Sequence, residues 1–305
     1  MKLIWSEMKL KKNIIVLAIL LCFGILPMQT LAQETPNFKE YLTMRLAKSK
    51  RAGQTDNKGI PLSSICNVDE EVVAARVFAD YGAMFVAALA NPSGIKFPTK
   101  CVFANSQETE TYQSKANPTL QTVGGVQITL QKPAMDALLL AVKEAAEKNL
   151  RISPRGGSEA ASRSYDDTLR LWNSRFLPAL SFYVSKGKIS RQDAEVVKKM
   201  QITDQVTQVL EWEKQKLWFS TDRTKSILYS VAAPGTSQHI FMLALDVEQF
   251  GNKQVRDILA KYGWFQTVQS DLPHFTYLGV SRDELNSYGL VRKVVSGQEF
   301  WIPNL

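Results

Sequence analysis

The sequence predicts an α+β fold in which helices gather early in the chain and the strands of an antiparallel sheet gather late. Residues 69–89 place apolar side chains at helical spacing, and residues 160–184 do the same over a longer stretch. In the last third, short apolar runs are separated by Gly, Pro and Asn, which is typical of strands and turns. Helices are therefore expected to flank the sheet and to build the N-terminal region.

The remaining elements follow from local signals. Ser190 with Asp193 has the spacing of a helix N-cap, and Asn252 is expected to cap a helix that ends at Gly263. Other helices are expected over residues 38–48, 133–148, 191–199 and 203–216. Strands are expected over residues 125–130, 150–152, 227–231, 241–247, 264–268, 274–278 and 299–302. Residues 51–59 are rich in turn formers and are predicted to be a linker.

Residues 1–32 have the features of a signal peptide. Lysines precede an apolar run over residues 14–25, and Thr30-Leu31-Ala32 offers small residues before a cleavage point. The run is short for a membrane span, so no stable span is expected after cleavage. Met1 and Met8 are both possible starts. The mature chain is expected to be periplasmic or secreted.

Two cysteines, Cys66 and Cys101, lie beyond the predicted signal peptide. An exported chain enters an oxidising compartment, so a disulfide between them is expected, with two free buried thiols as the alternative. Residues 33–130 would then form a helical N-terminal region stapled by this bond. Residues 131–305 would form a second domain.

The formal net charge of +8 is dispersed along the chain. Arginines and aromatic residues do not interleave in the manner of a nucleic-acid surface, so no nucleic-acid partner is expected. A solvated surface accounts for the charge, and an acidic cell-wall polymer is a possible partner. The sequence does not indicate an oligomeric state.

The chain contains only two histidines, His239 and His274, and both lie in its strand-rich last third. Asp246 lies in the otherwise apolar segment 241–247, where a buried carboxylate needs an ion-pair partner or a metal. Two imidazoles and one carboxylate make a three-ligand zinc site that leaves a fourth position for water, the pattern of catalytic zinc. The alternative is two unrelated histidines.

The spacing of two of these residues raises a difficulty. Asp246 lies seven positions after His239, an odd offset, so strict strand alternation would place their side chains on opposite faces. Both can reach one metal only if His239 precedes the regular strand or if a bulge intervenes. The upstream Pro234-Gly235 pair makes a loop before His239 plausible.

The segment from Ser237 to Asp246 resembles the Ser-x-His-x-x-Gly-x-Ala-x-Asp motif of the zinc D-alanyl-D-alanine carboxypeptidases of the VanY type. Residues 271–279 (Asp-Leu-Pro-His-Phe-Thr-Tyr-Leu-Gly) are similar to that family's second motif, Glu-Pro-Trp-His followed by an aromatic residue and Arg-Tyr-Val-Gly. Residues 152–157 resemble its Ser-Gly-Tyr-Arg-Ser segment more weakly. Met242 replaces the usual Gly, Pro273 the usual Trp, and Asp271 the usual Glu.

The resemblance implies a role for each matching residue. His239, Asp246 and His274 would bind Zn²⁺, and Asp271 would act as the general base. Ser237 would line the site, and Arg155 would hold the C-terminal carboxylate of the substrate. Arg163 is the alternative arginine. The long separation between Arg155 and the first histidine implies a helical insertion over about residues 160–220 in a peptidase domain 131–305.

By this resemblance the chain is expected to be a zinc carboxypeptidase that acts on peptidoglycan stem peptides. Two alternatives use the same scaffold: an L,D-carboxypeptidase and an endopeptidase. A third is a zinc-stabilised cell-wall-binding protein without catalysis, which the altered motif positions would fit.

Overall fold

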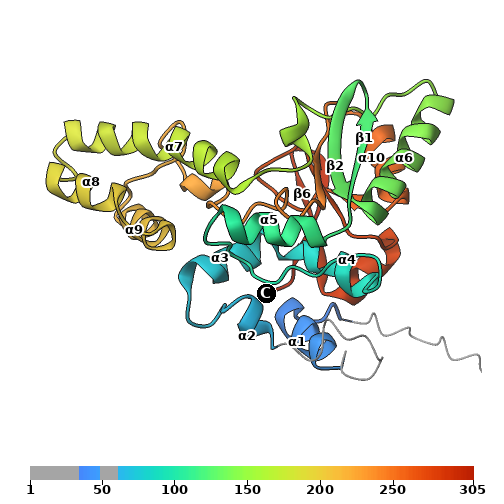
Figure 1. The fold of residues 1–305 in the computed structure, drawn as a ribbon, viewed down its shortest axis with the longest axis horizontal. Helices are drawn as coiled ribbons and strands as arrows, with labels where there is room; N and C mark the ends of the chain where they lie inside the picture. Colours follow the sequence, from blue (N-terminus) through green and yellow to red (C-terminus); the bar gives the residue numbers. More distant parts are fainter. Residues whose placement is uncertain (1–33, 49–60) are drawn as a thin grey trace, which may run out of the picture. The chain divides into compact units, whose positions relative to one another are not determined.

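The computed structural model of the protein describes residues 34–48 and 61–305. The predicted signal peptide and the predicted linker at residues 51–59 lie outside these ranges. Residues 35–305 form one compact unit, and one hydrophobic core runs through it, from Phe38 in the first helix to Trp301 in the last strand. The α+β class is confirmed, with a helical N-terminal part and small antiparallel sheets (Figure 1).

The N-terminal part is built from short helices that lie in or against this core. A 3-10 turn at Gly82–Met84 joins α3 to α4. The stretch Val72–Ala90 is apolar and long enough to cross a membrane, but 67% of its most apolar window is buried inside the protein, as in a soluble core helix. The helices of this part are α1 (Phe38–Lys48), α2 (Leu62–Ile65), α3 (Val72–Tyr81), α4 (Phe85–Ala90) and α5 (Ser106–Lys115).

The middle of the chain combines a hairpin with four helices. Strands β1 (Pro118–Val123) and β2 (Val126–Gln131) form an antiparallel pair that packs on α6 (Lys132–Glu147). A capping box at Ser164 begins the long helix α7, and Ser190 caps α8 as predicted. Helix α8 (Arg191–Lys198) packs on α7 (Tyr165–Ser185) and on α9 (Ile202–Lys214), and the three are drawn in yellow shades in Figure 1.

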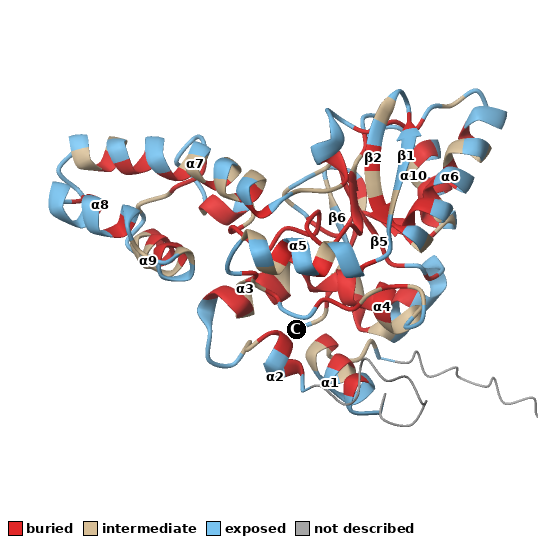
Figure 2. Ribbon diagram, viewed as in Figure 1, coloured by how far each residue is buried: buried red, intermediate tan, exposed pale blue. Residues whose placement is uncertain are grey.

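The last third contains the sheet that organises the site. Its strand order is β3-β5-β4, all antiparallel, with β3 (Ala244–Asp246), β4 (Trp264–Phe265) and β5 (His274–Tyr277). Strand β5 is buried along its whole length, in red in Figure 2. Helix α10 (Lys253–Lys261) packs on α6 and β4, and a separate hairpin pairs β6 (Leu290–Val295) with β7 (Gln298–Pro303).

Four strand predictions need correction, and one of them is the expected strand 264–268, which is reduced to β4. Residues 227–231 contain a 3-10 turn, Ile227–Tyr229, because side chains of Ser226 and Glu213 accept its first backbone N–H groups. Residues 150–152 form no strand, and only one bridge, Pro154 to Val247, joins that segment to the sheet region. The expected strand 241–247 is reduced to β3. The sequence analysis missed β1 and β6.

The predicted disulfide is present. Cys66 and Cys101 are bonded, and both are buried in the core. Cys66 lies at the C-terminal end of α2, and the backbone N–H of Cys101 donates to Ile65 O (2.8 Å). The bond therefore ties α2 to the segment that leads into α5.

Candidate metal centre

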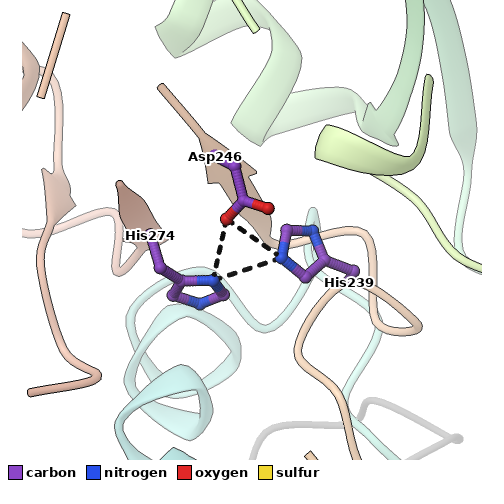
Figure 3. Close-up of side chains that lie close together, drawn as sticks. All are labelled: His239, Asp246 and His274. Atoms are coloured by element: carbon purple, nitrogen blue, oxygen red, sulfur yellow. Dashed lines mark hydrogen bonds and ion pairs between the residues drawn. The ribbon is translucent and has the colours of Figure 1, made fainter. Parts of the chain in front are cut away.

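Three side chains converge at one point of the central sheet (Figure 3). His239 Nε2 lies 3.2 Å from His274 Nδ1, and Asp246 Oδ1 lies 3.3 Å from the former and 3.2 Å from the latter. Ligand atoms about 2.0 Å from a tetrahedral metal lie about 3.3 Å from one another. The three donor atoms thus form a triangle of the size that a tetrahedral ion requires, and the group could hold a metal.

Strand register brings two of the three together. Asp246 on β3 is the Cα partner of His274 on β5, so the two side chains stand side by side on one face of the sheet. The apolar residues around them fill the core: Leu245 and Phe275, the neighbouring partners in the register, are both buried. The same alternation that buries the apolar side chains therefore pairs the acid with the imidazole.

His239 reaches the group from a turn that precedes β3. Residues 238–242 are in turns, and Met242 has a φ of 55°, in the left-handed region. Because the chain changes direction here, His239 is outside the regular strand, and its side chain can reach the same face of the sheet as Asp246. Met242 stands where the resembling motif has Gly, the residue that adopts this conformation without strain. Its buried side chain offsets the backbone cost, because it packs in the core.

Gly235, just before this turn, has no room for a side chain. Gly235 has a φ of 76°, and a Cβ atom at this position would lie 2.0 Å from the carbonyl oxygen of Phe103. Its own carbonyl accepts the N–H of Phe103 (2.9 Å). This close backbone contact fixes the start of the His239 turn against the segment before α5.

Two glutamines from the first half of the chain, the buried Gln131 and the half-buried Gln113, hold the rest of the turn. Gln131 Nε2, at the end of β2, donates to Phe241 O (2.9 Å), and its backbone N–H donates to Met242 O (3.0 Å). Gln113 Nε2 on α5 donates to Ile240 O (3.0 Å). These bonds satisfy carbonyl groups that no sheet partner reaches, so the left-handed turn is held from outside the sheet.

A third glutamine orients an imidazole. His274 Nε2 lies 2.7 Å from Gln238 Oε1, an acceptor, so this nitrogen carries the proton and Nδ1 presents its lone pair to the metal position. Gln238 Oε1 also accepts from Thr276 (2.5 Å), and its Nε2 donates to Tyr81 O (2.8 Å). Such outer partners fix ligand orientation in metal sites.

The protonation states suit metal binding. Burial lowers the pKa of His239 to about 4, with the Asp246 carboxylate opposing this shift, so the imidazole is neutral near pH 7. Burial alone would raise the pKa of Asp246, but the two imidazoles hold it well below its usual value. His239 therefore offers a neutral nitrogen and Asp246 a carboxylate, the protonation states that metals bind.

The second oxygen of Asp246 is held by an arginine. Arg163 Nη2 donates to Asp246 Oδ2 (2.9 Å), and the two side chains are 20% and 14% exposed. Arg163 Nε donates to Glu159 O (3.1 Å), and its carbonyl accepts from Gln113. The charge-assisted bond leaves Asp246 Oδ1 free to face the imidazoles.

The donor triangle opens on a cavity of about 290 Å³. Ser237, Asp271 and both histidines line it, together with Tyr81 and residues of α7 and of the Ile227–Tyr229 turn. Burial raises the pKa of Asp271 above its ordinary value, and the nearby His274 partly offsets this. Asp271 keeps solvent-exposed surface, so its carboxyl stands at the cavity wall, where it meets both protein and water.

Ser237 and Arg155 lie at different distances from this cavity. Ser237 is buried, lines the cavity and accepts a long bond from the His239 N–H (3.4 Å). The Arg155 guanidinium lies over the ring of Phe250, 5.3 Å from its centroid, and Arg155 is not among the cavity-lining residues. The structure thus brings Ser237, Asp271 and Arg163 to the donor group and directs Arg155 to a ring outside the cavity.

The donor set fits zinc better than a harder ion. Two imidazole nitrogens and one carboxylate oxygen are typical zinc ligands, whereas Mg²⁺ and Ca²⁺ select oxygen. Gln113, Gln131 and Gln238 were not predicted, because nothing in the sequence distinguishes a glutamine that bonds a distant backbone group from one on the surface. The pairing of Arg163 with Asp246 was not predicted either, because nothing in the sequence shows that the two residues lie close together.

No protein-family model matches the chain, and no curated protein matches it significantly. Among solved structures it is similar to a crystal structure of the vancomycin-resistance D,D-pentapeptidase VanY from a VanB-type resistance cassette, in complex with Zn(II). The TM-score is 0.29 and the identity 14%, and the match covers 55% of this chain and 82% of that chain. A TM-score of this size establishes neither a shared fold nor a shared activity, so the chemistry depends on the residues of the site itself.

Proposed function

We propose that this chain is a zinc peptidase that removes the C-terminal D-amino acid from peptidoglycan stem peptides, as a periplasmic or secreted protein. The observation that carries the proposal is the donor triangle of His239, Asp246 and His274, with edges of 3.2–3.3 Å, whose two histidines line a cavity. The motif resemblance supports the substrate class. The features of a signal peptide in residues 1–32 support export.

The residues divide the chemistry among themselves. His239, Asp246 and His274 would hold a Zn²⁺, which would lower the pKa of a water molecule to about 7 and polarise the scissile carbonyl. Asp271 takes the proton of the attacking water and delivers it to the leaving amine, since it lines the same cavity as the histidines. Arg163 holds the Asp246 carboxylate in place, and Ser237 lines the substrate path.

A direct assay tests this proposal. Purified pentapeptide stem fragments ending in D-Ala-D-Ala are incubated with the zinc-loaded protein, and the products are weighed by mass spectrometry. We expect the loss of one alanine, its suppression by a chelator, and its recovery when zinc is added back. Bound zinc without hydrolysis of any stem peptide would favour a wall-binding protein instead. Hydrolysis that a chelator does not affect would remove the metal from the mechanism.

Endopeptidase activity is the second candidate, and one feature favours it. A further cavity of about 240 Å³ shares Tyr81, Tyr229 and Ser270 with the first, so the site continues beyond the donor triangle. A longer peptide could occupy both cavities. An endopeptidase would cut cross-linked stem peptides at an internal bond, whereas a carboxypeptidase would release only a terminal residue, so the product masses separate the two.

The glutamine that orients His274 offers a test of the metal site. We expect Gln238→Leu to weaken zinc binding by about 10- to 100-fold, because His274 Nε2 loses the acceptor that fixes its tautomer. Competition with a chromogenic chelator measures the dissociation constant.

Gln205→Leu is the matched control. Gln205 is also buried, accepts from Trp172 (2.8 Å) and donates to Val197 O (3.0 Å), but it lies outside the cavity. Both changes should lower the free energy of unfolding, and only Gln238→Leu should change zinc affinity. An equal effect of the two on zinc would contradict the role given to Gln238.

A further inference from the structure

A carboxypeptidase must recognise the terminal carboxylate of its substrate, and arginine is well suited to this task. The two arginines singled out from the sequence already have partners. Arg155 lies over the Phe250 ring, and Arg163 is paired with Asp246. Recruiting Arg163 to a substrate would release the metal-facing carboxylate from its support.

A third arginine lines the same cavity. Arg175, on the long helix α7, and Leu171 one turn earlier line the cavity together with the histidines and Asp271. The helix begins at a complete capping box, with Ser164 and Asp167 bonded to each other's backbone. Arg175 therefore projects from a helix whose N-terminus is well anchored, which suits a group that has to position a ligand.

The Arg175 side chain has no acidic partner among the residues that the structure describes. Its Nη1 donates to the Ser174 hydroxyl (2.6 Å), and its Nε is buried without any hydrogen-bond partner. A half-buried cation without a counter-charge costs free energy, and a bound carboxylate would offset this cost. By contrast, Arg170 on the same helix is paired with Glu159 and Asp167.

We propose that Arg175 binds the C-terminal carboxylate of the substrate and so determines the preference for a free chain end. This inference rests on the proposed function for the identity of the substrate. It assigns a specificity role to helix α7, which contributes Leu171 and Arg175 to the cavity lining. The carboxylate would lie across the cavity from the donor triangle, with the scissile bond between them.

Binding of an uncleavable ligand tests the inference separately from turnover. The probe is acetyl-D-Ala-D-Ala with a ketomethylene group in place of the final peptide bond, prepared as the free acid and as the primary amide. Calorimetry measures both with the zinc-loaded full chain. We expect the acid to bind the unmodified chain about 10- to 100-fold more tightly than the amide, and Arg175→Gln to abolish this difference while zinc binding is retained.

Arg191→Gln is the matched control, because Arg191 is an exposed arginine at the start of α8 and does not line the cavity. It should keep the preference for the acid. A preference that persists in Arg175→Gln, or an acid and amide that bind alike or not at all, overturns the inference. If the acid preference depends on Arg175 but stem peptides are not cut, the inference stands and the proposed peptidase activity fails.

Discussion

His274→Ala is expected to abolish zinc binding and to reduce peptide hydrolysis to the level of the chelated protein. The substitution removes one of three donors and leaves Asp246 Oδ1 and His239 Nε2 as the remaining pair. Two ligands cannot hold a catalytic zinc at micromolar concentrations, since such sites use three protein donors. Elemental analysis after gel filtration and the stem-peptide assay measure both losses.

Thermal unfolding distinguishes loss of metal from loss of fold. Zinc at 100 times its dissociation constant should stabilise the unmodified chain by about 2.7 kcal/mol, because it binds only the folded state. The His274→Ala chain should unfold in one transition whose midpoint does not respond to zinc. Tyr277→Phe, on the same strand, should keep the zinc response. A zinc-dependent rise in the midpoint of His274→Ala would argue against His274 as a ligand.

Asp271→Asn is expected to lower kcat by about 10²–10⁴-fold with little change in KM, because the amide cannot accept a proton from water. Zinc should remain bound, since Asp271 is not part of the donor triangle. Steady-state kinetics on the D-Ala-D-Ala stem peptide, with zinc content measured on the same samples, gives both quantities. A loss of kcat with unchanged zinc content indicates a general base, whereas a parallel loss of kcat and zinc indicates a metal ligand.

Asp271→Glu is the matched rescue. The resembling motif has glutamate at this position, so the longer carboxylate should retain a large part of the rate that asparagine loses. Hydrolysis by Asp271→Asn at the unmodified rate would assign the proton transfer to another group. Equal losses in the Asn and Glu variants would point to a packing role for Asp271.

The parts of the fold that the sequence predicted are those with strong local signals. The helix at residues 38–48, the caps at Ser190 and Asn252, and the stop at Gly263 all match the structure. The predictions that were wrong lie where side-chain contacts from other parts of the chain override the local preference for a strand. Residues 227–231 have strand-like composition, yet the buried Glu213 carboxylate accepts the Ile227 N–H and stabilises a turn. That contact joins residues on either side of an exposed loop, so no short window of sequence contains it.

The donor group was inferred from the sequence because histidine is scarce and because an acid stood in an apolar segment. Its support could not be inferred. Gln131 reaches Phe241 O and Gln238 reaches Tyr81 O across 110 and 157 residues. The residues next to these glutamines in the sequence do not distinguish them from glutamines on the surface. The side chain is the same in both cases, and only its environment in the fold differs.

These long-range glutamine contacts constrain how the molecule matures. The turn that carries His239 depends on Gln113 and Gln131, and its Gln238 depends on Tyr81 in the first third of the chain. Contacts between such distant residues close large loops and form slowly. The first half of the chain therefore acts as an intramolecular scaffold. An isolated C-terminal fragment would lack these anchors, so the donor triangle should assemble only late in folding, once the two halves of the chain have met.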